Sequence, residues 1–127
     1  MSTNAMVAHK VEGGYECIYV HWDGYIDGVG KALKEAFNTK SKVAELISLG
    51  DCSSIAGATC IDEVESYFRD RNANGDEEWD DIKPRVYHTL AKAIDAFGNL
   101  YNYVWDNNTW TIYNRDGDGL SWDSDED

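Results

Sequence analysis

YNYVWDNNTWTIY, residues 101–113, carries the strongest hairpin pattern in the chain. Tyr101, Tyr103 and Trp105 alternate with smaller or polar side chains, which is the twofold period of a β-strand. Residues 106–108 are Asp-Asn-Asn, types that tolerate the positive φ angles of a tight turn, and the segment after them forms the return strand. The pattern predicts a β-hairpin in a sheet with one half-exposed face.

Upstream of the hairpin, the sequence predicts three further extended segments. Tyr15–Trp22 is largely apolar on both faces, which indicates a central strand rather than an edge strand. Glu63–Arg69 has the pattern of a strand, and Arg85–Tyr87 follows the single proline, Pro84, as a short extended piece.

Three segments carry apolar side chains at the spacings of three and four that mark the buried face of a helix. The first begins with Asp27 as a predicted N-cap and runs to Phe37. The second ends at Gly50, where a left-handed C-terminal residue is expected. The third begins after the predicted cap Thr89 and ends at Gly98.

This order of elements predicts an α+β fold, with an antiparallel sheet, about three helices packed on one face and a C-terminal hairpin. We expect residues 1–127 to form a single domain, because a chain of this length buries a sizeable core. Within it, residues 1–14 are predicted to be a loose leader, 15–113 the folded core and 114–127 an acidic tail.

The net charge of −13 limits the classes of partner. Phosphates of DNA or RNA and anionic membrane surfaces repel such a chain, so direct nucleic-acid and membrane binding are not expected. The acidic field favours a basic protein or a cation, and plain solubility is the alternative purpose of the charge. The three cysteines lack metal-ligand spacing, so we expect them to be buried as small apolar side chains and the protein to occupy a reducing compartment, the cytoplasm. No apolar run has the length of a signal peptide or a membrane span.

The negative charge is concentrated in two segments. Residues 62–81 contain nine acids and two arginines, a net charge of −7, and residues 114–127 contain six acids and one arginine, a net charge of −5. On one side of the sheet they would form a single anionic face, and the alternative is two separate solvated segments. The residues predicted to form that acidic, partner-binding face are Asp76, Glu77, Glu78, Trp79, Asp80, Asp81, Asp116, Asp118, Trp122 and Asp123.

Two stretches match the frame of an EF-hand calcium loop. In the first, Asp70, Asn72, Asn74 and Asp81 are the candidate ligands, although the last position normally holds Glu and a strand rather than a helix is predicted before the loop. The second frame starts at Asn114, with no helix after it. The alternative is a chance match, because an acidic chain with Asn-Gly and Asp-Gly turns produces such patterns.

A possible polar site comprises His21, Asp23, Arg69, Asp70 and Arg71, which lie near the ends of predicted strands. A small enzyme would need a nucleophile or base with an orienting partner there. The sequence contains no recognised nucleophile, zinc-protease, P-loop or dinucleotide motif. The alternative is a structural hydrogen-bond network.

Four segments resemble a family of small proteins of tailed bacteriophages and prophages. They are IYVHWDGYIDGVGKAL at 18–33, KVAELISLGDCSSI at 42–55, YFRDR at 67–71 and the aromatic segment at 101–113. The family is largely uncharacterised, so the resemblance implies a viral setting rather than an activity. It also implies that Arg69-Asp70-Arg71 is a motif in its own right, with Asp70 engaged by its neighbours rather than by a metal.

Charge and resemblance together predict a phage-encoded, non-enzymatic inhibitor or modulator of a host protein in the bacterial cytoplasm. Carboxylates on such a protein can stand where phosphates bind in a basic nucleic-acid channel, as in a counter-defence protein of the anti-CRISPR or anti-restriction type. A calcium-binding module and a small enzyme remain the alternatives, and no cofactor other than calcium is predicted.

Overall fold

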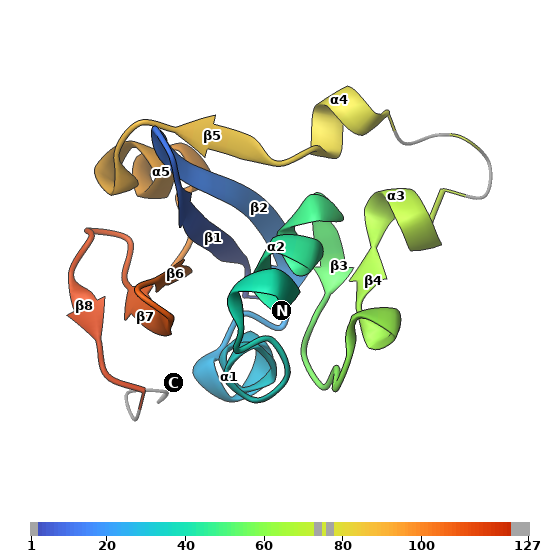
Figure 1. The fold of residues 1–127 in the computed structure, drawn as a ribbon, viewed down its shortest axis with the longest axis horizontal. Helices are drawn as coiled ribbons and strands as arrows, with labels where there is room; N and C mark the ends of the chain where they lie inside the picture. Colours follow the sequence, from blue (N-terminus) through green and yellow to red (C-terminus); the bar gives the residue numbers. More distant parts are fainter. Residues whose placement is uncertain (1–2, 73–74, 76–77, 123–127) are drawn as a thin grey trace.

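The computed structural model describes residues 3–72, 75 and 78–122, and a mixed sheet runs through its centre (Figure 1). Its strands are β1 (Ala5–Val11), β2 (Gly14–Trp22), β3 (Cys52–Ser54), β4 (Glu65–Ser66), β5 (Arg85–Tyr87), β6 (Tyr101–Asp106), β7 (Thr109–Tyr113) and β8 (Gly119–Leu120). The strand order is β4-β3-β2-β1-β6-β7-β8, and β5 pairs with β2 outside this path. The helices are a π-helix (Ile26–Gly30), α1 (Lys31–Ala36), α2 (Lys40–Ser48), a 3₁₀ helix (Ile61–Glu63), α3 (Tyr67–Asp70), α4 (Trp79–Ile82) and α5 (Leu90–Phe97).

Strand β1 corrects the prediction of a loose leader over residues 1–14. It lies in the middle of the sheet, antiparallel to β2 and parallel to β6. Ala5, Met6, Val7 and Ala8 are all fully buried. A short apolar run without alternation is the pattern of a strand that is covered on both faces, and this explains why a search for twofold periodicity missed it.

The sheet is mixed, whereas the sequence predicted an antiparallel one. The pair β2–β3 is parallel because the π-helix, α1 and α2 form a crossover between these strands, and the pair β1–β6 is parallel as well. The strand predicted over Glu63–Arg69 is also wrong in large part. The Ser66 side chain accepts a hydrogen bond from the Arg69 backbone N–H at 3.1 Å, and this cap starts α3 in place of an extended chain.

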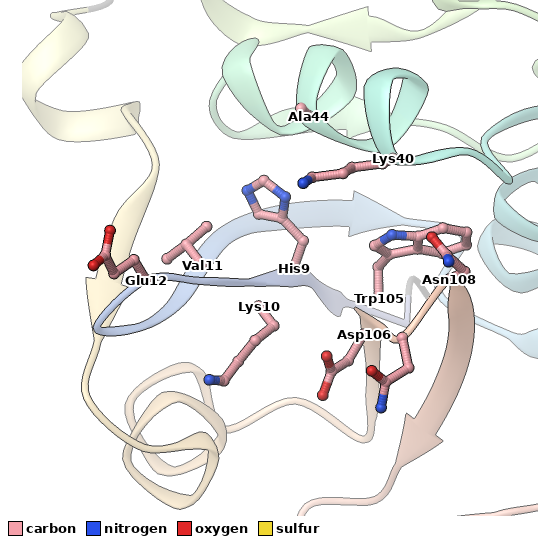
Figure 2. Close-up of a pocket in the computed structure, with 10 residues that line it drawn as sticks. His9, Lys10, Val11, Glu12, Lys40, Ala44, Trp105, Asp106 and Asn108 are labelled. Atoms are coloured by element: carbon pink, nitrogen blue, oxygen red, sulfur yellow. The ribbon is translucent and has the colours of Figure 1, made fainter.

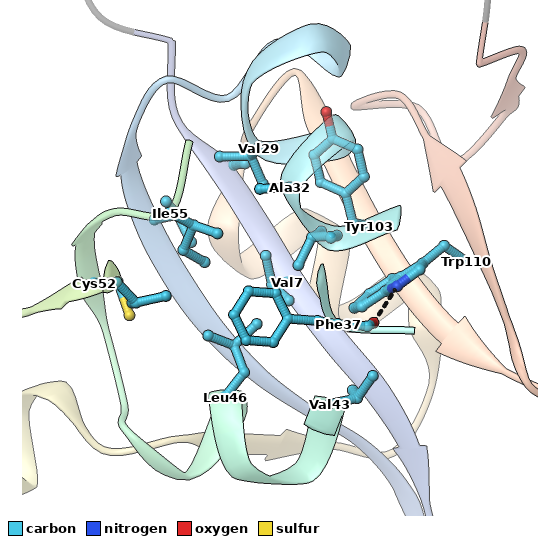
Figure 3. Close-up of a cluster of buried hydrophobic side chains, with 14 of the residues drawn as sticks. Val7, Val29, Ala32, Phe37, Val43, Leu46, Cys52, Ile55, Tyr103 and Trp110 are labelled. Carbon is cyan, nitrogen blue, oxygen red and sulfur yellow. Dashed lines mark hydrogen bonds between the residues drawn. The ribbon is translucent and has the colours of Figure 1, made fainter. Parts of the chain in front are cut away.

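Helices cover both faces of the sheet, which corrects the prediction of helices on one face. The larger core lies under α1 and α2 and includes Phe37 and Leu46, with Trp110 donating from Nε1 to the Phe37 carbonyl at 2.9 Å (Figure 3). The opposite face packs against α5, through Ala93 and Ile94. Helices α1, α2 and α5 lie where helices were predicted, but α5 packs on the face of the sheet opposite α1 and α2.

Several local predictions are confirmed. Thr89 is an N-cap whose side chain accepts from the third backbone N–H of α5, and Thr39, which was not predicted as a cap, does the same for α2. The hairpin of β6 and β7 turns at Asn107 and Asn108, which have φ angles of 55° and 62°. Gly98 ends α5 in the left-handed conformation. Asp27, by contrast, is not a cap, because the first helical segment begins as a π-helix after Tyr25.

Two of the three cysteines are buried as predicted. Burial raises the pKa of the Cys17 and Cys52 thiols to about 12, so both are inert hydrophobic side chains. Cys60 is exposed, contrary to the prediction. In the part of the chain that the structure describes, no helix combines the length and the apolar character needed to span a bilayer.

Candidate functional site

In the described part of the chain, α3 and α4 lie toward one end of the longest axis of the molecule, and β8 lies at the other (Figure 1). The described acids of the predicted single anionic face are therefore divided between two places, with Glu78, Asp80 and Asp81 at α4 and Asp116 and Asp118 just before β8. Of the residues predicted for that face, Asp76, Glu77 and Asp123 lie outside the described residues, as does the rest of the tail after Trp122.

At the β8 end, Trp122 packs on the core, whereas Asp116 and Asp118 face solvent. Trp122 is partly buried against the core, 6.2 Å from the Tyr103 ring centroid, and the Lys34 ammonium lies 4.6 Å from the Trp122 ring centroid. Asp116 and Asp118 are exposed, and their backbone N–H groups donate to the Asn114 side chain in a local turn.

At the other end, two aromatic rings contact each other at the surface between α3 and α4. The ring centroids of Phe68 and Trp79 are 5.3 Å apart in an edge-to-face arrangement, and the two residues are 40% and 39% exposed. Trp105 and Trp110, in contrast, are buried core residues. We call the set Phe68, Glu78, Trp79, Asp80 and Asp81 the α3–α4 surface.

Helix α4 is held in place by the chain segment that ends α2. The Asp51 backbone N–H donates to the Ile82 carbonyl at 2.7 Å. A Cβ on Gly50 would lie 2.5 Å from the same carbonyl oxygen and 3.2 Å from the Trp79 indole, so only glycine permits this approach. One edge of Trp79 thus packs against the body of the protein while the rest of the ring faces solvent.

The carboxylates of the α3–α4 surface are only partly neutralised. Asp80 forms an exposed ion pair with Lys83 at 3.2 Å. Glu78 and Asp81 are exposed and have no ion pair among residues 3–72, 75 and 78–122. The aromatic pair therefore sits beside uncompensated negative charge.

The predicted polar site separates into smaller groups. Arg69 bonds to the Asp70 carboxylate with its Nε at 2.8 Å and to the backbone carbonyls of Ile61 and Val64. His21 Nδ1 is 2.9 Å from the Tyr19 hydroxyl. Asp23 lies beyond the end of β2, where its backbone carbonyl accepts from Val29.

The structure does bring His21 and Arg71 to one region. The parallel pairing of β2 with β3 places His21 beside Ser53, and Arg71 donates to the Ser53 hydroxyl at 3.1 Å. Arg71 also lies 3.8 Å from the Glu65 carboxylate. This is a hydrogen-bond network that ties α3 to β3, and within the described part of the chain it contains no nucleophile hydrogen-bonded to a base that a third group orients.

Asp70 is engaged by its neighbours, which counts against the first calcium frame. Its carboxylate accepts from Arg69 and from the Ser66 backbone N–H at 2.8 Å. The Arg69 hydrogen bond holds the pKa of Asp70 below its ordinary value, with the Ser66 N–H contributing in the same direction. Of the other proposed ligands, Asn74 lies outside the described residues. Among the residues that are described, no three His, Cys, Asp or Glu side chains are grouped as a metal site.

Sequence reasoning missed the most buried ion pair. Asp51 is 8% exposed, and its carboxylate accepts from Arg85 Nη2 at 2.6 Å and from the Tyr19 backbone N–H at 2.8 Å. Burial raises the pKa of Asp51, against the opposing effects of the Tyr19 N–H and of Arg85. No local pattern pairs residues 51 and 85, because the contact depends on β5 lying beside β2.

Comparisons with protein-family models, with curated proteins and with solved structures find no match for this chain. The function proposed below therefore depends on the physical character of the described surfaces and on the sequence resemblance.

The Asp70–Arg69 pair gives a testable acid dependence. Because the folded pKa of Asp70 is below its ordinary value of 3.8, its ionised form stabilises the fold above that pH, and this contribution is lost as the pH falls through the folded pKa. We expect Asp70→Asn to lower the free energy of unfolding by about 1 kcal/mol at pH 7, a value discounted for the partial exposure of the pair. Urea unfolding at pH 7 and at pH 2 would measure it, with a smaller difference from the native chain at pH 2 than at pH 7.

The matched control is Asp95→Asn, which removes an exposed carboxylate of α5 without an ion pair in the described chain. It should leave the free energy of unfolding within a few tenths of a kcal/mol at both pH values. An Asp70→Asn difference that persists undiminished at pH 2 would show that the charge of Asp70 is not what stabilises the fold.

Proposed function

We propose that this protein acts by binding a basic partner protein through the α3–α4 surface. The observation that carries the proposal is the half-exposed pair of Phe68 and Trp79 beside the unpaired carboxylates of Glu78 and Asp81. Aromatic side chains supply most of the binding energy at protein interfaces, and charged groups at the rim set the choice of partner and the association rate. A partner with lysine or arginine side chains around an apolar contact would match both features.

The preformed geometry favours binding over a purely solvated loop. Trp79 is fixed at one edge by Gly50, and Phe68 is fixed by the short capped helix α3. Rings that are already ordered lose little side-chain entropy when a partner covers them. If this surface served only to keep the protein soluble, the carboxylates would be sufficient and the two exposed rings would not be needed.

The phage resemblance supports a host protein in the bacterial cytoplasm as the partner. With a net charge of −13, the chain would be attracted to a protein whose basic surface normally contacts nucleic acid. Inhibition would then follow from occupation of that surface, with Glu78, Asp80 and Asp81 standing in for phosphates. This is the mode of action of a counter-defence protein of the anti-CRISPR or anti-restriction type, and it requires no catalysis by this chain.

The test compares two charge reversals of equal size. Tagged native protein is used to capture partners from a bacterial lysate, and the affinity for the captured protein is then measured by titration. Glu78→Lys/Asp81→Lys should weaken binding about 100-fold or more, because attraction becomes repulsion at the contact. Asp116→Lys/Asp118→Lys makes the same change in net charge at the opposite end and should leave the affinity within about threefold.

A third variant tests the aromatic pair. Phe68→Ser/Trp79→Ser should also weaken binding about 100-fold, since truncation of interface aromatics typically costs 2 kcal/mol or more. Circular dichroism and thermal unfolding of each variant establish that the fold is retained. Equal loss of binding in both charge reversals would mean that net charge alone attracts the partner, and full binding by the α3–α4 variants would place the contact elsewhere. Either result refutes the proposal.

A further inference from the structure

A pocket of ≈ 480 Å³ opens where the turn between β1 and β2, the turn between β6 and β7 and the start of α2 meet (Figure 2). It lies away from the α3–α4 surface and has no part in the function proposed above. The lining residues used below are His9, Glu12, Lys40, Ala44, Trp105 and Asp106.

Trp105 contributes a hydrogen-bond donor that opens on the pocket. The residue is 6% exposed, and its ring packs edge-to-face on Trp110 with the centroids 5.5 Å apart. The Trp110 indole N–H donates to the Phe37 carbonyl, whereas that of Trp105 has no hydrogen-bond partner within residues 3–72, 75 and 78–122. Figure 2 shows the Trp105 nitrogen on the side of the ring that faces His9 and Lys40. This nitrogen is not among the fully buried unpartnered atoms of the described residues, so its N–H is accessible to a molecule in the pocket.

The side chains of Lys40 and His9 point into the same pocket. Lys40 has no ion pair in the described chain, and Figure 2 shows its ammonium group directed toward the His9 ring. The His9 side chain is 12% exposed and is held by Nε2, which lies 2.8 Å from the Glu16 carboxylate. Its Nδ1 has no hydrogen-bond partner among the described residues.

The carboxylates of the lining do not neutralise this group. Side chains alternate along a strand, so Asp106 is directed to the face opposite Trp105. Figure 2 shows the carboxylates of both Asp106 and Glu12 turned away from the Lys40 ammonium. In a strongly acidic protein, this corner of the pocket brings the Lys40 ammonium, the Trp105 indole N–H and the His9 ring close together. Ala44 and the edge of the Trp105 ring give it an apolar wall.

We propose that this pocket binds a small organic molecule that carries an oxyanion, either a carboxylate or a phosphate monoester. The Trp105 indole N–H and the Lys40 ammonium donate to the oxyanion, His9 flanks it, and the apolar body of the ligand packs against Ala44. Carboxylates and phosphates share the acceptor geometry that these donors require. The volume admits a molecule the size of a substituted aromatic ring, within the usual range of small-ligand pockets.

The test is a titration followed by the indole N–H signals of ¹⁵N-labelled protein. The probes are benzoate, phenyl phosphate and the neutral benzamide, and Trp105→Phe identifies the Trp105 signal by its disappearance. Benzoate or phenyl phosphate should shift that signal with a saturable curve in the millimolar range or tighter, and the stronger of the two identifies the oxyanion. Benzamide should leave the signal unchanged.

The matched variants are Lys40→Gln and Lys42→Gln, which remove equal charge from the same helix. Lys42 is exposed and is not among the residues lining the pocket. The first should weaken binding at least about tenfold, and the second should leave it within about twofold. The proposal is overturned by the absence of a saturable shift with either anion, by equal binding of benzamide, or by equal effects of the two lysine variants.

Discussion

Replacing Arg85 with methionine is expected to lower the free energy of unfolding by about 3 kcal/mol at pH 7. The substitution leaves the Asp51 carboxylate buried with a single hydrogen bond, from the Tyr19 backbone N–H. An uncompensated buried charge is among the costliest single defects in a folded protein. The Cζ atom of Arg85 lies 5.0 Å from the Phe97 ring centroid, and methionine preserves much of this packing. The loss of stability should therefore come mainly from the unpaired charge of Asp51.

The pH dependence of this loss identifies its cause. Burial already raises the pKa of Asp51, and removal of Arg85 takes away one of the groups that oppose this rise. A carboxyl group whose folded pKa is raised stabilises the fold below its ordinary pKa of 3.8, and that contribution disappears as the pH rises through the folded pKa. The deficit of Arg85→Met should therefore be small near pH 3 and full at pH 7, as measured by urea unfolding.

Two further variants separate charge from packing. Asp51→Asn added to Arg85→Met should recover most of the lost stability at pH 7, because a neutral amide oxygen can still accept from Tyr19. Lys83→Met breaks the exposed pair with Asp80 and should change stability by no more than about 0.5 kcal/mol. A deficit of Arg85→Met that is the same at pH 3 and pH 7 would assign the loss to packing instead.

Gly14→Ala is expected to be comparably damaging, at about 3 kcal/mol and a fall in melting temperature of about 10 °C. A Cβ at position 14 would lie 2.1 Å from the Tyr87 carbonyl oxygen, which belongs to the backbone of β5 and cannot rotate away. Strand β5 would have to move from β2, and with it the pairing of Tyr15 with Tyr87 and the position of Arg85.

Gly119→Ala is the control for this substitution. A Cβ at position 119 meets no atom within 4 Å, and the residue has no positive φ, so melting by circular dichroism should show a change of no more than about 2 °C. Hydrogen exchange would locate the damage, because the amides of β5 should lose protection before those of β6 and β7. A Gly14→Ala protein with native stability would mean that β5 adapts freely to β2.

The sequence predicts the locally encoded parts of this fold well. The cap at Thr89 and the Asn107-Asn108 turn depend on neighbouring residues only, and both are confirmed. The position of β1 and the parallel pairings could not be obtained in this way, because strand order is decided by contacts between distant segments. The sequence feature that could have indicated β1 is the run of four apolar residues without alternation, all of which are buried.

Charge counting located the α3–α4 surface but not its composition. The surplus of acids at 62–81 indicated that region. The contact between Phe68 and Trp79 was not predictable in the same way, because it joins two helices that are separate in the sequence. Charge counting could not decide between one acidic face and two separate segments, because sequence position says nothing about which end of a sheet a segment occupies. The pocket at Trp105 was missed for a similar reason, since three separate segments form it.

The placement of β1 between β2 and β6 affects how the chain is made. During translation β2 emerges directly after β1 and can pair with it, but the opposite edge of β1 has no neighbour until Tyr101–Asp106 has left the ribosome. For most of synthesis that edge presents unpaired backbone groups next to Ala5 and Val7, a template for pairing with other nascent chains. That edge of β1 is paired only once β6 has docked on it, so the sheet closes around β1 late in synthesis.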